Sequence, residues 1–273
     1  MNTEYLDIQG GRIAYDVTGS PEAPLVVCAP SMGDVRAEYR FLVPQLVEAG
    51  YRVATMDVRG LGESSVAWPN YSVVEVGSDM LALVHHLGSE TAILIGNSMA
   101  GGAAVWAAAE APELMSGLVL IDPFVRDFQS LWARVMPVLF ADLWGASMWV
   151  KYYSSLYPSR RPADFDAYRA KLSANLREPG RLNALRQMVF ASKAASEAAL
   201  ARVRAPALVV MGTRDPDFKD PAGEARWIGE RLRALVHLIE GAGHHPHAEM
   251  PEECGPVIVE FLSTLPVEAA RVA

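Results

Sequence analysis

Short apolar runs alternate with segments of helical periodicity along most of this chain, and this alternation limits the possible folds more than any other feature. The runs are continuously apolar, as at Leu25–Ala29, which is typical of strands buried on both faces. Further strands of this kind are predicted at 52–56, 92–96, 118–121, 207–211 and 236–239. Strands and helices in alternation form a parallel sheet with helices on both faces, so the predicted class is α/β with a mostly parallel, doubly wound sheet.

The spacing of apolar residues places helices between these strands. They are predicted at 39–49, 73–87, 98–111, 222–232 and 251–265. The chain begins differently, with two short alternating runs at 5–9 and 12–17 joined by Gly10 and Gly11. Paired glycines supply the positive φ of a tight turn, so a β-hairpin is predicted at the N-terminus.

Composition excludes several classes of protein. With 273 residues, 51% of them hydrophobic, the chain can bury a large core without disulfide bonds or structural metals. Its two cysteines, Cys28 and Cys254, cannot form a disulfide framework or a structural zinc site. A net charge of −8 argues against nucleic-acid binding. The polar start and the lack of any apolar run of about 18 residues predict an intracellular, cytoplasmic protein with no membrane span.

The alternation stops between residues 124 and 204, where only helical patterns occur. Ligands bind at the carboxyl ends of strands in doubly wound sheets, so an insertion after a strand end is placed to act as a lid. The predicted division is a core of residues 1–123 and 205–273 and a helical cap of residues 124–204.

The insertion differs in composition from the rest of the chain. It holds 12 of the 23 aromatic residues, and 13 Lys and Arg against 6 Asp and Glu. Its basic residues either draw anionic substrates to a pocket or form an outer face that pairs with the acidic core. Three tryptophans are candidates for lining an apolar pocket or holding the lid on the core: Trp132, Trp144 and Trp149.

The segment Gly96-Asn97-Ser98-Met99-Ala100 follows a predicted strand and begins a predicted helix. Small residues permit a sharp turn that exposes the serine hydroxyl at the helix N-terminus, where the helix dipole favours negative charge. This G-x-S-x-A spacing is that of a nucleophile elbow, with alanine in place of the last glycine. A serine in such a position is often only a helix cap, but the strand–turn–helix context favours Ser98 as a nucleophile.

Two later strands end in residues that complete a catalytic triad. Asp215 lies in the turn after strand 207–211, and His244 follows strand 236–239. An imidazole suits the role of base because it titrates near neutrality, and a carboxylate would fix its tautomer. All three side chains follow strand ends in the order Ser, Asp, His, so Ser98, Asp215 and His244 are the predicted triad.

These motifs resemble those of the α/β-hydrolase fold family over nearly the whole chain. Residues 57–64, DVRGLGES, are similar to the family's D-x-R-G-x-G-x-S loop. Residues 243–251, GHHPHAEMP, are similar to its G-H-x-P-x-x-E-x-P segment, which marks His244 as the triad histidine. The turn 212–215 looks like the family's acid turn. The resemblance implies a helical cap, a small-molecule substrate and no cofactor.

One loop departs from the family pattern. The family usually has His-Gly after the strand that supplies the first oxyanion-hole amide, whereas this chain has Pro30-Ser31-Met32-Gly33. The Met32 N–H would still be a donor, with the Met99 N–H as its partner, because backbone donors do not depend on the side chain. Ser31 either tunes the hole, binds substrate or is a turn residue. Asn97, beside the nucleophile, is a further candidate for binding substrate.

Other residues compete for these roles. Asp122 also follows a strand, and some relatives place the acid there, whereas Asp217 is assigned to a loop or the cap. His245 and His247 follow His244, but no second group of carboxylate or cysteine ligands stands nearby in the sequence. No metal site is therefore predicted.

The sequence thus predicts a serine hydrolase that forms an acyl-enzyme from a small to medium carboxylic ester or thioester. One alternative is a carbon–carbon bond hydrolase for anionic ring-fission products (keto-dienoates). The G-N-S-M motif and the basic insertion favour it, but the usual glycine-rich oxyanion loop is missing. A second alternative is a slow-turnover receptor. The family's epoxide and haloalkane hydrolases use an aspartate nucleophile, and position 98 is serine.

Overall fold

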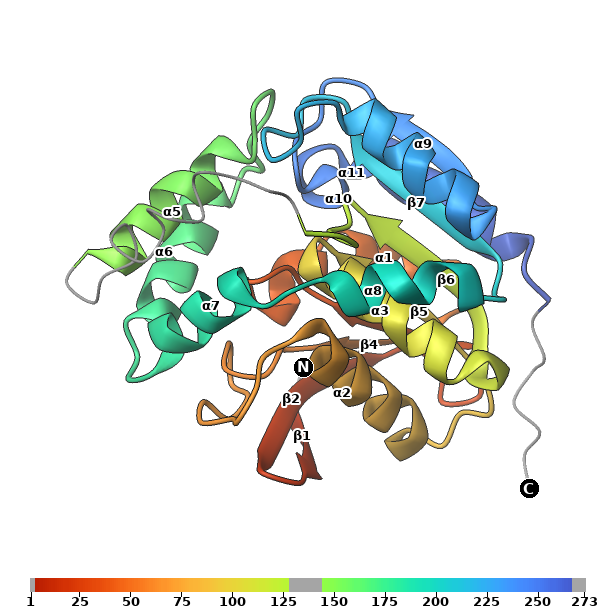
Figure 1. The fold of residues 1–273 in the computed structure, drawn as a ribbon, viewed down its shortest axis with the longest axis horizontal. Helices are drawn as coiled ribbons and strands as arrows, with labels where there is room; N and C mark the ends of the chain where they lie inside the picture. Colours follow the sequence, from red (N-terminus) through yellow and green to blue (C-terminus); the bar gives the residue numbers. More distant parts are fainter. Residues whose placement is uncertain (1–2, 128–143, 267–273) are drawn as a thin grey trace.

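The centre of the molecule is a single eight-stranded sheet in the order β1-β2-β4-β3-β5-β6-β7-β8. The computed structural model describes residues 3–127 and 144–266 (Figure 1). The strands are β1 (Glu4–Ile8), β2 (Gly11–Thr18), β3 (Leu25–Ala29), β4 (Arg52–Met56), β5 (Ala92–Asn97), β6 (Met115–Ile121), β7 (Ala207–Gly212) and β8 (Leu235–Ile239). Only β2 runs antiparallel to its neighbours, β1 and β4, and the other neighbouring pairs are parallel. The predicted mostly parallel sheet is confirmed.

Helices cover both faces of this sheet (Figure 1). In chain order they are α1 (Leu42–Glu48), α2 (Val73–His86), α3 (Met99–Glu110), α5 (Gly145–Ser155), α6 (Phe165–Leu176), α7 (Arg181–Phe190), α8 (Ala194–Ala199), α9 (Pro221–Leu232), α10 (Pro246–Glu249) and α11 (Pro251–Ser263). The strand β3 shows the two-faced burial: Val27 packs on the α2, α3 and α9 side, and Val26 on the α1 and α11 side. The core therefore consists of two apolar layers, one on each side of the sheet.

The N-terminal hairpin forms as predicted, but its two glycines have different roles. Gly10 has φ +98 and makes the turn. Gly11 is the first residue of β2, and a Cβ there would lie 2.7 Å from Ser65 Cβ and 2.8 Å from the Trp68 ring. The prediction that both supply positive φ is therefore wrong for Gly11, which is needed for close packing.

A helical region is inserted between β6 and β7. Helices α5, α6 and α7 stand to one side of the sheet, at the left of Figure 1. Helix α8 instead packs against α3, where Ser196 Oγ donates to Gly102 O at 2.8 Å. The predicted 124–204 segment thus contains one part that stands apart from the sheet and one that packs on the core. Within the described ranges, no helix combines the length and the apolar character needed to cross a bilayer.

The loop 57–64, which resembles a family motif, is part of the scaffold. Buried Asp57 accepts hydrogen bonds from the Arg36 side chain and backbone, and Arg59 forms an ion pair with buried Asp79. A Cβ on Gly62, which has φ +56, would lie 2.0 Å from the Asp57 carboxyl carbon. The loop therefore fixes the surroundings of β4 rather than contributing side chains to the cavity described below.

Candidate active site

The turn between β5 and α3 holds Ser98 in a strained conformation. Its φ of 57 and ψ of −122 fall in a region that disfavours side chains with a Cβ, at a cost of order 1–3 kcal/mol. Four backbone hydrogen bonds hold it there: Ser98 N donates to Ile121 O at 2.9 Å, and Ser98 O accepts from Phe124 N at 2.9 Å, Gly101 N at 3.0 Å and Gly102 N at 3.3 Å. The neighbouring strand β6 and its following loop therefore maintain this turn.

Glycine is required at some positions of this turn, whereas another position of the motif accommodates alanine. A Cβ on Gly96 would lie 2.3 Å from Ala100 O, and one on Gly102 would lie 2.3 Å from Phe124 O. Ala100, which replaces the last glycine of the motif, is fully buried without such a conflict. On α3, the backbone of Phe124 comes close to Gly102 and not to Ala100, so alanine at position 100 is compatible with the elbow.

His244 and Asp215 form a short hydrogen bond from separate strand ends. His244 Nδ1 lies 2.6 Å from Asp215 Oδ2, and both side chains are buried. Burial alone would lower the pKa of His244, but the charge and hydrogen bond of Asp215 outweigh it. With the charges of Asp217 and Asp122, they raise the pKa to about 10. This environment stabilises the imidazolium form.

Asp122 lies beside this pair without taking the place of Asp215. Its Oδ1 accepts a hydrogen bond from Gly212 N at 3.0 Å. Burial first, and then the charge of Asp215, raise its pKa well above the usual value. The hydrogen bond of His244 to a carboxylate goes to Asp215, so the geometry favours Asp215 over Asp122 as the partner of His244.

Asp217 and Tyr152 contribute polar groups that the sequence did not indicate. Asp217 Oδ2 lies 3.8 Å from His244 Nδ1, and the Tyr152 hydroxyl lies 2.7 and 2.6 Å from the two Asp217 oxygens. Burial raises the pKa of Asp217. The assignment of Asp217 to a loop or the cap misses its position in the cavity. The spacing Asp215-x-Asp217 at the end of β7 was the available signal.

These side chains meet in a cavity of about 210 Å³. It is lined by Ser31, Met32, Ser98, Phe124, Trp149, Tyr152, Tyr153, Leu156, Val189, Asp217 and His244. Most of these are aromatic or aliphatic, and none of the described lining residues is Lys or Arg. Of the predicted oxyanion donors, Met32 lines the cavity and Met99 directly follows Ser98 as the first residue of α3.

The predicted substrate-binding residues are not all at this cavity. Trp149 lines it, and its Nε1 donates to Gly33 O at 3.2 Å. Trp144 is 46% exposed at the start of α5 and is not in the lining, and Trp132 lies outside the described residues. Trp144 therefore lies at the exposed start of α5 and not at this cavity, where it was predicted.

Asn97 is also absent from the lining. It is fully buried, and its Nδ2 donates to Ile121 O at 2.9 Å and to His244 O at 3.0 Å. These bonds to backbone oxygens occupy the amide donors that a substrate would need. The structure therefore gives Asn97 a structural position, between β6 and the His244 loop, rather than the predicted contact with substrate.

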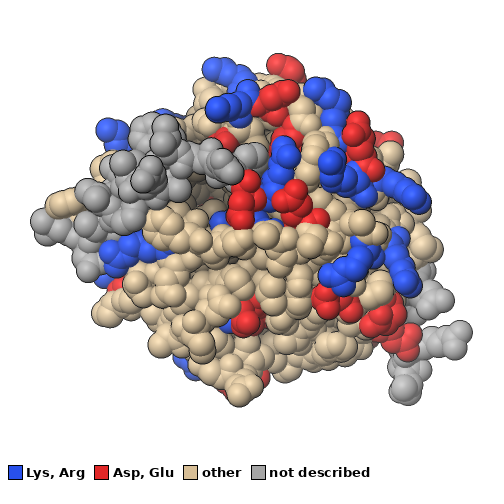
Figure 2. Space-filling view, viewed as in Figure 1, with Lys and Arg blue, Asp and Glu red and all other residues tan. Residues whose placement is uncertain are grey.

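Three arginines of the insertion form ion pairs with the acidic core. Arg126 pairs with Glu224 on α9, and Arg202 pairs with Glu110 on α3. Arg160 pairs with two glutamates of α11, Glu252 and Glu253. On the face drawn in Figure 2, basic and acidic side chains lie interspersed rather than separated into fields of one sign.

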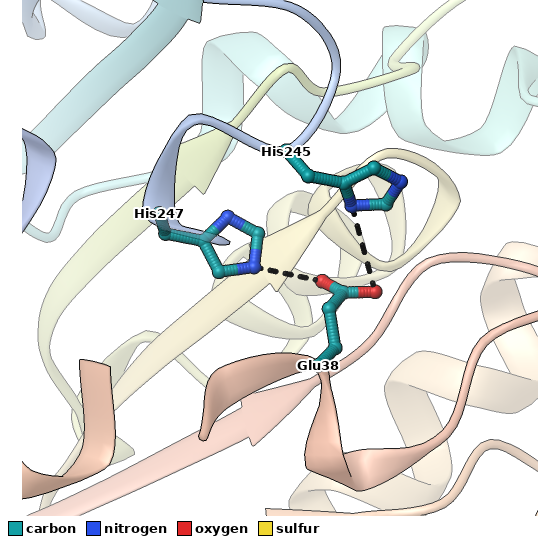
Figure 3. Close-up of side chains that lie close together, drawn as sticks. All are labelled: Glu38, His245 and His247. Atoms are coloured by element: carbon teal, nitrogen blue, oxygen red, sulfur yellow. Dashed lines mark hydrogen bonds and ion pairs between the residues drawn. The ribbon is translucent and has the colours of Figure 1, made fainter. Parts of the chain in front are cut away.

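A second polar cluster lies behind the cavity, with Glu38 at its centre. Figure 3 shows the rings of His245 and His247 turned toward the Glu38 carboxylate. His247 Nε2 lies 3.1 Å from Glu38 Oε1, and His245 Nδ1 lies 3.9 Å from Oε2. Burial raises the pKa of Glu38 to about 7 and lowers that of His247 to about 3. Both shifts favour the neutral form of the buried side chain, because burial disfavours charged groups.

The side chains of this cluster are also of the types that bind metal ions. One ligand atom each from Glu38, His245 and His247 lie within 4.8 Å of one another. A metal-bound imidazole usually donates its other ring N–H to a partner. Within residues 3–127 and 144–266, His245 Nε2 and His247 Nδ1 have no hydrogen-bond partner. Glu38 Oε2 already accepts two hydrogen bonds from Ser31. The cluster therefore fits a hydrogen-bond network better than a metal centre.

Comparison with known proteins identifies the fold family in which this site occurs. Residues 24–251 match the alpha/beta hydrolase fold family. Epoxide hydrolase A of Mycobacterium tuberculosis is 26% identical, over 95% of this chain and 97% of that protein. The 3-oxoadipate enol-lactonase 1 of Acinetobacter baylyi is 25% identical, over 94% of this chain and 95% of that protein.

Solved structures share the fold. A thermophilic esterase from Thermogutta terrifontis superposes with a TM-score of 0.81 at 22% identity, covering 96% of this chain and 98% of its own. The enol-lactonase of Burkholderia xenovorans LB400 gives a TM-score of 0.81 at 21% identity, covering 95% of this chain and 100% of its own. The eight-stranded sheet with an inserted helical region is thus a known architecture.

Proposed function

Because the chain belongs to the α/β-hydrolase fold family, we propose that it is a serine hydrolase that cleaves small carboxylic esters through an acyl-enzyme. One observation carries this proposal. Ser98, on its strained turn, lines the same cavity as His244, whose Nδ1 lies 2.6 Å from Asp215. A nucleophile, a base and a carboxylate that orients the base are the parts that acyl transfer requires.

The reaction follows from these positions. Ser98 Oγ attacks the ester carbonyl carbon while His244 Nε2 takes the hydroxyl proton. Asp215, bonded to Nδ1, stabilises the resulting imidazolium. The backbone N–H groups of Met32 and Met99 donate to the carbonyl oxygen as it becomes negative. His244 then gives the proton to the leaving alcohol. A water molecule, deprotonated by the same imidazole, releases the carboxylic acid and restores Ser98.

The cavity favours neutral acyl groups of modest size. Its volume of about 210 Å³ is below the usual range for pockets that take drug-sized ligands. Its described lining is mainly apolar and contains the Asp217 carboxyl but no Lys or Arg. An anionic keto-dienoate would find no Lys or Arg among the described residues of this lining, which argues against carbon–carbon hydrolysis of such products. Lactones are cyclic esters, so the named enol-lactonases support testing them alongside open esters.

The inserted helical region would act as a cap in this proposal. Helix α5 contributes Trp149, Tyr152 and Tyr153 to the cavity, the residue after it contributes Leu156, and α7 contributes Val189. These side chains would exclude water from the acyl group and so strengthen the electrostatic contacts inside. The predicted cap, residues 124–204, is retained for this role except that α8 packs on the core.

The experiment is turnover of nitrophenyl acetate, butyrate and octanoate, with a small lactone in parallel. We expect activity on the shorter esters and loss of about 10⁶-fold in kcat in Ser98→Ala, as for triad removal in other serine hydrolases. A fluorophosphonate should label the wild type once and the variant not at all. Labelling without turnover would favour the receptor alternative. A variant that kept a tenth of wild-type turnover would exclude Ser98 as the nucleophile.

A further inference from the structure

We propose that Glu38 is a positioning residue that ties the loop carrying the first oxyanion donor to the loop carrying the base. The inference rests on the proposed serine-hydrolase function. Glu38 lies on the short 3-10 helix η1 (Arg36–Tyr39) and is fully buried. It belongs to none of the motifs that the chain shares with its family.

One oxygen of Glu38 holds the oxyanion loop. Its Oε2 accepts hydrogen bonds from Ser31 N at 2.9 Å and from Ser31 Oγ at 3.0 Å. The carbonyl oxygen of Ser31 accepts from Asp34 N at 3.2 Å. In a trans peptide the C=O and the following N–H point in opposite directions, so fixing the Ser31 carbonyl also fixes the direction of the Met32 N–H. The donor is thereby oriented before the transition state forms.

The other oxygen of Glu38 holds the loop of the base. Its Oε1 lies 3.1 Å from Nε2 of His247, which is on α10, three residues after His244. The adjacent Tyr39 reinforces the link, because its ring stacks on His247 with centroids 5.0 Å apart. The Tyr39 hydroxyl donates to Ala29 O at 2.7 Å, at the end of β3 and directly before the oxyanion loop. Two consecutive residues thus contact both loops.

The chemical character of Glu38 supports a specific role. Among the described residues it forms no ion pair with Lys or Arg, and its polar neighbours are Ser31, Asp34, His245 and His247. A buried carboxylate without a cation is costly compared with an apolar side chain of similar size. Its two oxygens instead serve two separate loops, a task that an apolar side chain in the same place could not perform.

This arrangement also assigns a role to Ser31. Its hydroxyl proton is donated to Glu38, so the hydroxyl presents only lone pairs to the cavity. Ser31 can therefore accept a hydrogen bond from a substrate or from water, but it cannot donate one to the oxyanion. Of the three interpretations of Ser31 that the sequence left open, holding the turn and accepting a hydrogen bond remain.

The test compares Glu38→Ala with Glu38→Gln. The glutamine oxygen can accept from Ser31 and its amide can donate to His247 Nε2, since His247 Nδ1 has no hydrogen-bond partner within the described residues and can carry the proton. We expect Gln to stay within about threefold of wild-type kcat and Ala to lose about 10²-fold, with little change in KM, as for loss of one oxyanion donor. Ser31→Ala should lie between them.

An alkyl boronic acid separates positioning from general damage to the fold. Boron accepts an electron pair from Ser98 Oγ, the hydroxyl proton passes to His244, and the tetrahedral adduct occupies the oxyanion hole. Its inhibition constant should rise in Glu38→Ala by the same factor as kcat/KM falls. Asp79→Asn is the control, because Asp79 is a buried carboxylate paired with Arg59 outside the cavity lining and should change only the melting temperature.

The outcomes are distinct. An unchanged inhibition constant in folded Glu38→Ala protein, or a loss confined to KM, would overturn the positioning role. If Glu38→Ala does not fold, the same boronate comparison on Ser31→Ala decides it, with an unchanged constant again counting against the proposal. A wild type that neither turns over esters nor reacts with a fluorophosphonate would instead refute the serine-hydrolase function itself.

Discussion

The carboxyl of Asp217 lies close enough to His244 to set the pH range of the enzyme, and Asp217→Asn tests this. Its Oδ2 is 3.8 Å from His244 Nδ1. At an effective dielectric constant of about 20, two unit charges at that distance attract by about 4 kcal/mol, or roughly a thousandfold in proton affinity. Burial also raises the pKa of Asp217, which opposes its ionisation beside His244. We therefore expect an actual change of about ten- to hundredfold.

The sign of the effect follows from the role of the base. His244 must be neutral to take the proton of Ser98, and its pKa is raised to about 10, so kcat/KM of the wild type should rise with pH through the alkaline range. Removing one negative charge lowers this pKa. In Asp217→Asn the acid limb of kcat/KM for a neutral ester should therefore move to lower pH by about one to two units. Tyr152→Phe should shift it in the same direction, because the carboxylate loses a hydrogen-bond donor and is ionised less. An acid limb that stays in place, or moves to higher pH, would refute this electrostatic reasoning.

Two further predictions concern the acid and the charge of the insertion. Asp215→Asn should lower kcat by about 10⁴-fold, whereas Asp122→Asn should cost far less, and a larger loss at Asp122 in steady-state assays would reassign the acid. Because the basic residues of the insertion described above are paired with core glutamates, kcat/KM for matched neutral and anionic esters should respond alike to a change from about 0.02 to 0.5 M salt. A selective several-fold loss for the anionic ester would show electrostatic steering instead.

Much of the fold was predictable because its determinants are local. Continuous apolar runs identified the buried strands β3 to β7, whereas β8, predicted as buried at 236–239, is a mostly exposed edge strand. Gly50, with φ +90, ends the region predicted as helix 39–49. The helix α1 nevertheless begins only at Leu42, and a division separates it from η1, which ends at Tyr39. The division arises from contacts distant in sequence: Glu38 and Tyr39 are turned toward Ser31, Ala29 and the α10 segment, which no periodicity records.

The candidate site was predictable where its residues belong to short sequence motifs. Ser98, Asp215 and His244 each follow a strand, and the structure brings His244 to Asp215 and places Ser98 at the same cavity. Asp217 and Glu38 were missed as site residues because their positions depend on partners far along the chain. Asp217 meets Tyr152 from the inserted region, and Glu38 meets His247 some 209 positions away.

The charge of the insertion shows why a count of residues does not establish a binding preference. The insertion has 13 Lys and Arg against 6 Asp and Glu, but this positive charge attracts anionic substrates only where the basic side chains are unpaired and face the substrate. In the structure, Arg126, Arg160 and Arg202 are instead directed at glutamates of α9, α11 and α3. These ion pairs join the inserted region to the sheet domain. The acidic group that does reach the cavity is Asp217, and its described lining contains no Lys or Arg. Three of the basic residues that suggested an anionic substrate therefore attach the inserted region to the core, and the lining of the cavity is consistent with the neutral ester proposed above.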